Sequence, residues 1–398
     1  MIKDLRERYN RNFTAEKYSN FLQSIESEYG YMPSFRISET PVFIPKDLKD
    51  KLIEACNDIQ KVIATPGFKN LTKNAIPGDA LKVPGEDEHT TFLQMDFGIT
   101  INDRGELFPQ LIELQGFPSL YFFQDQIAAA YKKHFNLPED LTSYPHGGTR
   151  REYIETLRKV IVGDFEPQHV ILLEIEPFKQ NTAIDFYSTA SHLGLKVICI
   201  TDLKKDGKKL FYLNDTGERV EVKRIYNRVI FDELDQRQDL KREFYFKDEV
   251  DVEWAGHPAW FFRISKYILP LLDSPFVPRT FYLEDLKEYP EDLENYVLKP
   301  LYSFAGAGIL LDVTPVDLDK IEDRKNYILQ RKVEYAPVIK TPSGPAKCEI
   351  RMMMVWEKDQ ARGTLVNNLV RLTKGRMVGV KFNLNKDWVG ASVGFFAG

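Results

Sequence analysis

Residues Phe92 to Gln115 read FLQMDFGITINDRGELFPQLIELQ, and this stretch decides the fold. Its first part, Phe92–Ile101, predicts a strand, and Asn102–Gly105 has the composition of a tight turn. Residues Gln110–Gln115 predict a second strand next to the first, so we expect a hairpin. A helix is predicted directly after it, from Ser119 to His134.

Two carboxylates and one amide on this hairpin could hold a metal ion. Asp96 lies on the first strand and Glu113 on the second, and Gln115 is two residues beyond Glu113 on the same strand face. These side chains offer the oxygen ligands that suit Mg²⁺ when ATP phosphates also hold the ion. The alternative is that Asp96 and Glu113 are two surface acids of a hairpin.

The middle of the chain alternates strands with a helix. Strands are predicted at residues 168–174 and 196–200, and a helix lies between them at residues 182–193, with Gly194 at its end. A strand, a helix and a strand within about 30 residues predict a βαβ unit and a parallel sheet. Residues 209–222 predict a further hairpin.

Composition limits the class of protein. The chain has 398 residues, and its 43% hydrophobic and 28% charged residues are an ordinary globular balance. Its formal charge of −5 gives no reason to expect nucleic-acid binding. Its N-terminus is charged from the outset, and no apolar run approaches the roughly 20 residues that span a bilayer. We therefore expect a cytoplasmic protein that binds neither nucleic acid nor a membrane.

A lysine and a glycine-rich loop follow each other near the end of a predicted strand. Tyr296–Pro300 predicts the strand and carries Lys299, and the loop 302–308, YSFAGAG, comes directly after it. Glycines let backbone N–H groups approach a phosphate closely, and Lys299 is well placed to neutralise its charge. Residues 309–313 predict another strand, so the alternative is an ordinary hairpin loop.

Three arginines are candidates for contacts with anions. Arg351 lies in the apolar predicted strand 349–355, where an unpaired guanidinium would be costly. We therefore expect it to meet an anion or a carboxylate. Arg228 and Arg371 are weaker candidates, since many arginines lie on protein surfaces.

Taken in order, these segments resemble the circularly permuted ATP-grasp ligases, the family that includes glutathionylspermidine synthase. Residues 93–96 (LQMD) and 111–120 (LIELQGFPSL) look like the family's two metal-binding strands, and residues 170–228 look like its Rossmann-like domain. A predicted helix from Trp260 to Leu272 is similar to the one that carries the first ATP lysine. Residues 297–308 look like the second ATP lysine with its glycine loop.

The resemblance implies an α/β chain with a circularly permuted ATP-grasp-like fold and a Rossmann-like pre-grasp domain. Residues 1–150 would complete the grasp domain and carry the metal-binding strands. Residues 151–250 would form the pre-grasp domain, and residues 251–398 the ATP-binding lobes. The implied cofactors are ATP and Mg²⁺, with Arg351 and Arg228 as catalytic residues. The metal ligands would be Asp96, Glu113 and Gln115. The nucleotide would be bound by Lys266, Lys299, Ser303, Ala305, Gly306, Gly308 and Gln330.

The activity that the resemblance implies is that of an ATP- and Mg²⁺-dependent carboxylate–amine ligase. ATP would phosphorylate a small-molecule or peptide carboxylate, and an amine would attack the acyl phosphate to give an amide. The chain departs from the family at Gln94, where an arginine is common, and at Gln115, which replaces an asparagine. It has no counterpart of the family's amidase domain, so no particular substrate carries over. The alternatives are a non-catalytic, regulatory nucleotide-binding protein and a phosphotransferase with the same fold.

Overall fold

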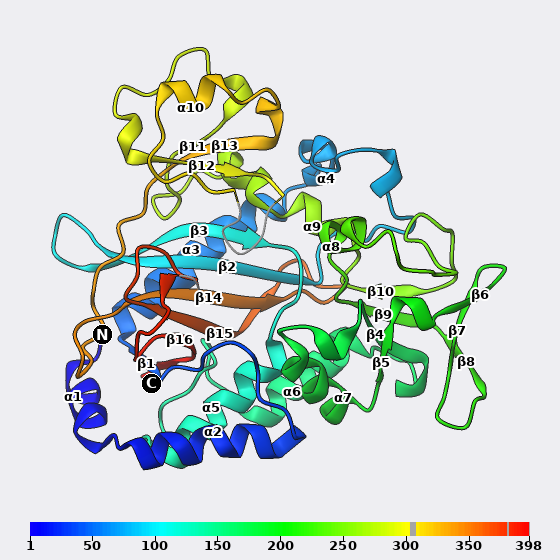
Figure 1. The fold of residues 1–398 in the computed structure, drawn as a ribbon, viewed down its shortest axis with the longest axis horizontal. Helices are drawn as coiled ribbons and strands as arrows, with labels where there is room; N and C mark the ends of the chain where they lie inside the picture. Colours follow the sequence, from blue (N-terminus) through cyan, green and yellow to red (C-terminus); the bar gives the residue numbers. More distant parts are fainter. Residues whose placement is uncertain (303–307, 380–381, 398) are drawn as a thin grey trace.

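The computed structural model describes residues 1–302, 308–379 and 382–397, and a five-stranded antiparallel sheet lies at its centre (Figure 1). In spatial order its strands are β16 (Gly390–Ser392), β15 (Thr364–Thr373), β14 (Lys347–Val355), β2 (Phe92–Ile101) and β3 (Leu107–Gln115). β14 pairs with β2 along most of its length. The central sheet therefore joins strands from the first third of the chain to strands near its C-terminal end.

The predicted hairpin is confirmed as β2 and β3. β2 has the predicted bounds, and β3 begins at Leu107, earlier than predicted. Gly105 adopts a positive φ of 77° in the turn, and its N–H donates to the carbonyl oxygen of Asn102. Asp96 pairs with Glu113 whereas Phe97 pairs with Leu111, so Ile112 is an extra residue that forms a β-bulge.

Side-chain alternation along β2 divides the central sheet into two faces. Leu93, Met95, Phe97 and Ile99 point into an apolar core on one side. Helix α3 (Lys46–Ile63) closes this core with a stripe of buried residues at helical spacing.

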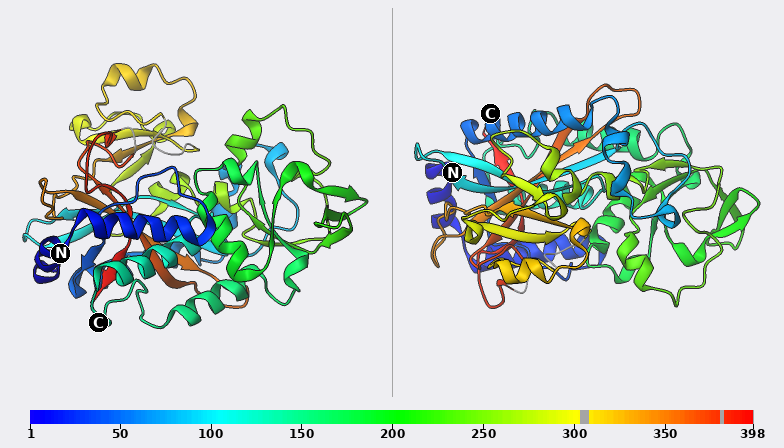
Figure 2. Two further views of the ribbon diagram at one scale, coloured as in Figure 1. Left: turned by 60° about the horizontal axis from the view of Figure 1, so that its bottom comes forward. Right: turned by 90° about the horizontal axis from the view of Figure 1, so that it is seen from above.

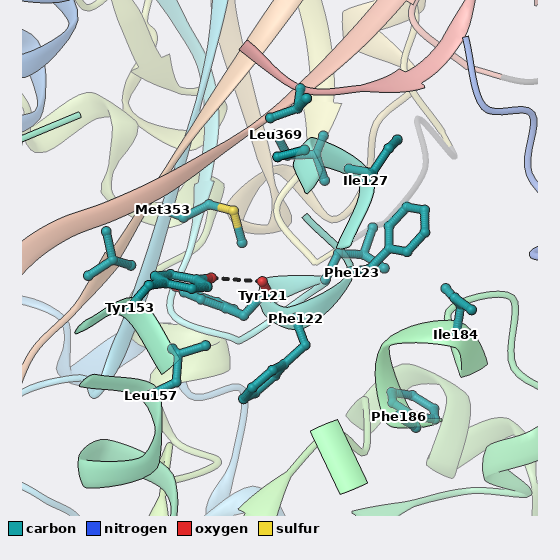
Figure 3. Close-up of a cluster of buried hydrophobic side chains, with 14 of the residues drawn as sticks. Tyr121, Phe122, Phe123, Ile127, Tyr153, Leu157, Ile184, Phe186, Met353 and Leu369 are labelled. Carbon is teal, nitrogen blue, oxygen red and sulfur yellow. Dashed lines mark hydrogen bonds between the residues drawn. The ribbon is translucent and has the colours of Figure 1, made fainter. Parts of the chain in front are cut away.

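The opposite face is apolar in one half and polar in the other. In the apolar half, Met353 of β14 and Leu369 of β15 join a core with α5 (Tyr121–Phe135) and α6 (Arg150–Ile161), as Figure 3 shows. The hydroxyl of Tyr153 on α6 donates to the carbonyl oxygen of Tyr121 at 2.7 Å and ties the two helices together. The polar half carries the candidate functional site.

A four-stranded parallel sheet lies beside the central sheet. Its order is β10 (Glu253–Ala255), β9 (Arg224–Asn227), β4 (Val170–Glu174) and β5 (Lys196–Cys199). Helix α7 (Ala183–Leu193) connects β4 to β5, and Gly194 ends it with a positive φ of 73°. The predicted βαβ unit is therefore confirmed. β6 (Lys204–Asp206), β7 (Lys209–Leu213) and β8 (Arg219–Val222) form a small antiparallel sheet that projects at the far end of the molecule (Figure 1).

A third antiparallel sheet forms a separate lobe with helix α10 (Pro315–Asp319), as Figure 2 shows. Its order is β11 (Thr280–Tyr282), β13 (Tyr327–Arg331) and β12 (Tyr296–Pro300). The lobe has its own small apolar core, which includes Leu283, Leu298 and Leu329. The strand predicted at residues 309–313 is wrong, since this segment pairs with β12 through a single bridge between Leu310 and Leu298.

The helix predicted from Trp260 to Leu272 is also wrong in part. α9 (Trp260–Arg263) ends after one turn, and a 3₁₀ helix follows at Lys266–Leu271. The carbonyl oxygen of Ile264 leaves the helix and accepts the N–H of Gly116, at the end of β3, at 2.9 Å. The Ser265 side chain then caps the second segment by accepting the N–H of Tyr267. A tertiary hydrogen bond thus overrides the local helical pattern.

Strands from the N-terminal and C-terminal parts of the chain pair with each other. β1 (Val42–Ile44) pairs in parallel with β17 (Gly394–Phe396). Further helices are α1 (Lys3–Asn12), α2 (Ala15–Tyr29), α4 (Phe68–Leu71) and α8 (Phe231–Gln236). Within the described ranges, no helix combines the length and the apolar character that crossing a bilayer requires.

The molecule is mixed α/β with several sheets, as predicted. The circular permutation, the Rossmann-like domain and the division at residues 150 and 250 stay predictions.

The segment between β13 and β14 crosses the polar half of the central sheet as a strap. The N–H of Ala336 donates to the carbonyl oxygen of Ile99 at 2.8 Å. The ring of Tyr335 lies so close to Gly98 that a Cβ built on this glycine would be 2.3 Å from the ring carbon Cε1. The absence of a side chain at position 98 therefore lets the strap lie against the sheet.

We expect Gly98→Ala to lower the free energy of unfolding by about 1–3 kcal/mol, because the added methyl group collides with the Tyr335 ring. Urea denaturation measures the effect. The same substitution at Gly78, where a Cβ would meet nothing within 4 Å, is the matched control. In a Tyr335→Ala background the cost of Gly98→Ala should shrink. An equal cost with and without the ring would show that the strap does not constrain this position.

Candidate functional site

Side chains from three adjacent strands meet on the polar half of the central sheet. Register places Arg351 of β14 opposite Asp96 of β2, and Glu349 of β14 opposite Arg371 of β15. These four residues project to the same face, since Glu349 and Arg351 are two residues apart on one strand. Asp96 and Glu349 are almost completely buried. The sheet thus brings together charged groups that lie more than 250 residues apart in the sequence.

Two arginines hold the Asp96 carboxylate. Arg351 binds it with two nitrogens, Nε to Oδ1 at 2.5 Å and Nη2 to Oδ2 at 2.7 Å. Arg371 Nη2 also donates to Oδ2. Burial alone would raise the pKa of Asp96, but the charges of Arg351 and Arg371 outweigh it and hold this pKa below its usual range. The expectation that Arg351 meets a carboxylate is therefore confirmed.

Glu349 is a second buried acid of this cluster, and the sequence analysis missed it. Its Oε1 accepts a hydrogen bond from Nη2 of Arg371, and its Oε2 accepts one from the Tyr335 hydroxyl at 2.5 Å. Burial raises the pKa of Glu349, although the charge of Arg371 opposes the shift. The sequence did contain a signal for Glu349. It lies two residues before Arg351 in a predicted strand, so the two side chains are expected on the same face.

Two glutamines continue the cluster toward the edge of the sheet. Arg351 Nη1 donates to Oε1 of Gln94 at 3.1 Å, and Gln115 Nε2 donates to the same oxygen at 2.8 Å. Gln115 Nε2 also donates to the carbonyl oxygen of Phe117 at 3.0 Å. Protein acceptors therefore occupy the amide nitrogen of Gln115, and its carbonyl oxygen is the atom that could meet a metal ion.

Lys299 connects the lobe to the central sheet. Its Nζ donates to Oε1 of Gln330 at 2.5 Å and to the carbonyl oxygen of Ile112, the bulge residue of β3, at 3.0 Å. Burial lowers the pKa of Lys299 to about 8, although the charge of Glu113 opposes the shift. The predicted lysine of β12 and the predicted metal strand β3 thus lie together in space.

A narrow pocket separates the edge of the central sheet from α9 and the 3₁₀ helix that follows. Glu113, Gln115, Phe117 and Lys266 are among the residues that line it. Its cavity volume is about 30 Å³, enough for a water molecule but not for a nucleotide. The pocket in this arrangement is therefore too small for a ligand of that size.

The three predicted metal ligands differ in what they contact. Asp96 lies between two guanidinium groups, and Gln115 is tied to Gln94 through its nitrogen. Glu113 has no ion pair with any residue in the described part of the chain, and it faces the pocket. No group of three or more His, Cys, Asp or Glu side chains among the described residues is arranged to hold a metal ion. Glu113 is thus the predicted ligand best placed for one.

The other predicted site residues divide into three groups. Lys266 and Gln330 lie near Lys299, as expected. Gly308 adopts a positive φ of 70°, and a Cβ there would be 2.9 Å from Cγ of Pro300. Ser303, Ala305 and Gly306 lie outside the described residues. The functional roles of all these residues stay predictions.

Arg228 lies apart from this cluster, and it contacts one of the residues that line the pocket, Phe117. Its guanidinium packs over the rings of Phe117 and Phe186, 4.8 Å and 5.4 Å from their centres. Its Nε and Nη1 atoms are buried and make no hydrogen bond within the described ranges. A buried guanidinium with unused donors is a suitable partner for an anionic ligand.

Comparison with known proteins gives one detailed likeness. No protein-family model matches the chain, and neither does any curated protein. The apo structure of a glutathione synthetase-like effector (GSS30) from Globodera pallida matches with a TM-score of 0.62. The match covers 96% of this chain and 96% of that chain, at 12% sequence identity. The fold is therefore glutathione synthetase-like, and this likeness shows the fold alone.

We expect Asp96→Asn to lower the free energy of unfolding by about 3–5 kcal/mol, because it leaves the buried guanidinium of Arg351 without its counter-charge and removes one of the two carboxylates that bind Arg371. Glu113→Gln is the matched control: it removes a charge on the neighbouring strand and should cost less than about 1 kcal/mol. Urea denaturation compares the two variants. Equal, small losses would mean that the ion pairs of Asp96 do not stabilise the sheet.

Proposed function

We propose that the protein is an ATP- and Mg²⁺-dependent carboxylate–amine ligase that forms an amide through an acyl phosphate. The observation that carries the proposal is the buried Lys299, which projects from the lobe toward the bulge of β3, beside Glu113 and Lys266. Two lysines could bind the phosphates of a nucleotide, and Glu113 could bind the Mg²⁺ ion that accompanies them. The glutathione synthetase-like fold supports the same conclusion.

In this proposal the nucleotide takes the place of protein groups that now contact Lys299. Its phosphates would replace the carbonyl oxygen of Ile112 as the acceptor for Nζ, and Lys266 would bind them from the other side of the pocket. Gln330 would approach the adenine from β13. Glu113 and the carbonyl oxygen of Gln115 would hold Mg²⁺, which would neutralise charge on the transferring phosphoryl group.

The reaction would begin when a substrate carboxylate oxygen attacks the γ-phosphorus of ATP. The bond to the oxygen that bridges to ADP breaks, and ADP leaves. An amine nitrogen then attacks the acyl carbon, inorganic phosphate leaves, and the amide forms. Arg228, whose guanidinium borders Phe117 at the pocket, would bind an anionic group of the carboxylate substrate. Closure of the lobe would keep water away from the acyl phosphate.

One observation favours a second candidate, a regulatory protein that binds nucleotide without ligating anything. Asp96, the first predicted metal ligand, is neutralised by Arg351 and Arg371 instead of facing the pocket as an open carboxylate. The similar protein from Globodera pallida is described as an effector, and that description does not require catalysis.

A trapping experiment separates the candidates. Pools of carboxylates are incubated with the protein, Mg²⁺, ATP and hydroxylamine, which captures an acyl phosphate as a hydroxamate. A ligase should release ADP and form hydroxamate in equal amounts. A phosphotransferase that acts on a hydroxyl group would release ADP without hydroxamate, and a regulatory protein would do neither. Lys299→Ala should abolish turnover in the folded protein, whereas Lys320→Ala, an exposed lysine of the same lobe, should not.

Nucleotide affinity should fall as the pH rises through about 8, the pKa of Lys299 in the free protein. Bound phosphate favours the charged ammonium and raises this pKa, so binding takes up a proton above pH 8 and affinity declines by up to about tenfold per pH unit. Below that pH the group is already charged and contributes no pH dependence. Calorimetric titration with ATP and Mg²⁺ between pH 7.5 and 9 measures the decline in nucleotide affinity.

Lys299→Arg is the control for the pH dependence, since a guanidinium stays charged throughout this range. Its nucleotide affinity should not decline between pH 7.5 and 9. An identical decline in the wild-type protein and in this variant would assign the titration to another group.

A further inference from the structure

A single nitrogen atom joins two buried carboxylates from neighbouring strands. Nη2 of Arg371, on β15, donates to Oδ2 of Asp96 on β2 and to Oε1 of Glu349 on β14. Glu113, on β3, also interacts electrostatically with Arg371 and Glu349. Two carboxylates therefore bind the end of one arginine side chain, and a third acts on it electrostatically.

The oxygens that face Arg371 are held in place by other partners of the same carboxylates. Arg351 binds both oxygens of Asp96, which fixes Oδ2 toward β15. The Tyr335 hydroxyl holds Oε2 of Glu349 and leaves Oε1 toward Arg371. Two fixed carboxylate oxygens aimed at one point form the arrangement in which a divalent cation bridges two acids.

Arg371 does not bind as arginines in structural ion pairs usually do. Arg351 uses two nitrogens against the two oxygens of Asp96, the bidentate geometry that makes such pairs strong. Arg371 places one nitrogen between two different acids, and its Nε is buried without a hydrogen bond to any described residue. Arg371 therefore binds the two carboxylates through the single atom Nη2, and not through the paired nitrogens of its guanidinium.

We propose that Arg371 is a fixed cation that occupies the place of a divalent ion between Asp96 and Glu349. In the native chain this acid pair then binds no metal, and Asp96 is removed from the predicted metal set. Glu113, with Gln115, is left as the carboxylate that meets Mg²⁺. One consequence rests on the proposed function. If a nucleotide binds here, the guanidinium of Arg371 replaces one of the metal ions that would otherwise lie beside it.

The test is the titration of free Mn²⁺, measured by electron paramagnetic resonance, in the absence of nucleotide. Arg371→Met removes the charge but keeps much of the side-chain length, and it should create a Mn²⁺ site that the wild-type protein lacks. Its affinity for this ion should exceed that of the wild-type protein by at least about tenfold. Arg371→Lys keeps the cation and should not gain the site. Arg371→Met combined with Glu349→Gln should lose it again.

Two measurements keep the test decisive if Arg371→Met folds poorly. Mn²⁺ should raise the melting temperature of Arg371→Met but not that of the double variant. In the otherwise native chain, Glu349→Gln should leave Mn²⁺ binding unchanged. The inference is overturned if Glu349→Gln weakens Mn²⁺ binding, or if folded Arg371→Met binds no more Mn²⁺ than Arg371→Lys. Because no nucleotide is present, failure of the proposed ligase activity would not alter either outcome.

Discussion

The ion pair between Asp96 and Arg351 is the constraint on which the rest of the structure depends. The Asp96 carboxylate is buried in the middle of the sheet. Without cations beside it, a buried carboxylate costs several kcal/mol, roughly as much as removing one partner of a buried ion pair. Arg351 and Arg371 supply that charge, and they come from strands near the other end of the chain. The pairing of β2 with β14 therefore places Asp96 opposite Arg351 on the polar half of the sheet. A slip by one residue would turn Asp96 into the apolar core behind the sheet.

The division of one sheet face into an apolar and a polar half locates the site. Along β14, Glu349 and Arg351 are polar, and Met353, the next residue on the same face, already belongs to the core beneath α5. Helices α5 and α6 thus pack against the apolar half, and the strap with Tyr335 covers part of the polar half. What remains open is the edge at β3, where Glu113 faces the pocket. The proposed chemistry would therefore take place at this edge of the sheet.

Local sequence patterns predicted much of this architecture, and they failed where tertiary contacts decide. Alternation and turn composition gave β2, β12 and the βαβ unit closely, because these elements depend on neighbouring residues. The segment 260–272 departs from its helical pattern because Ile264 gives its carbonyl oxygen to Gly116 of β3. Asp96 was assigned to a metal because nothing near it in the sequence shows that two distant arginines reach it. Pattern alone could place Lys299 at the end of a strand, but it could not show that Ile112 would meet it across the lobe.

The contacts of Lys299 are compatible with a proposed nucleotide site that is closed before the nucleotide binds. A buried ammonium needs polar acceptors at all times, and in the closed arrangement Gln330 and the carbonyl oxygen of Ile112 supply them. A phosphate oxygen could replace the carbonyl oxygen without leaving the lysine unpaired. Exchanging one acceptor for another costs less free energy than leaving the buried ammonium with no acceptor. The β-bulge makes this possible, since the extra residue turns a backbone carbonyl out of the ladder toward the lobe. If the proposed function holds, the carbonyl of Ile112 is the group that a phosphate would displace from Lys299, and opening and binding would be one coupled step.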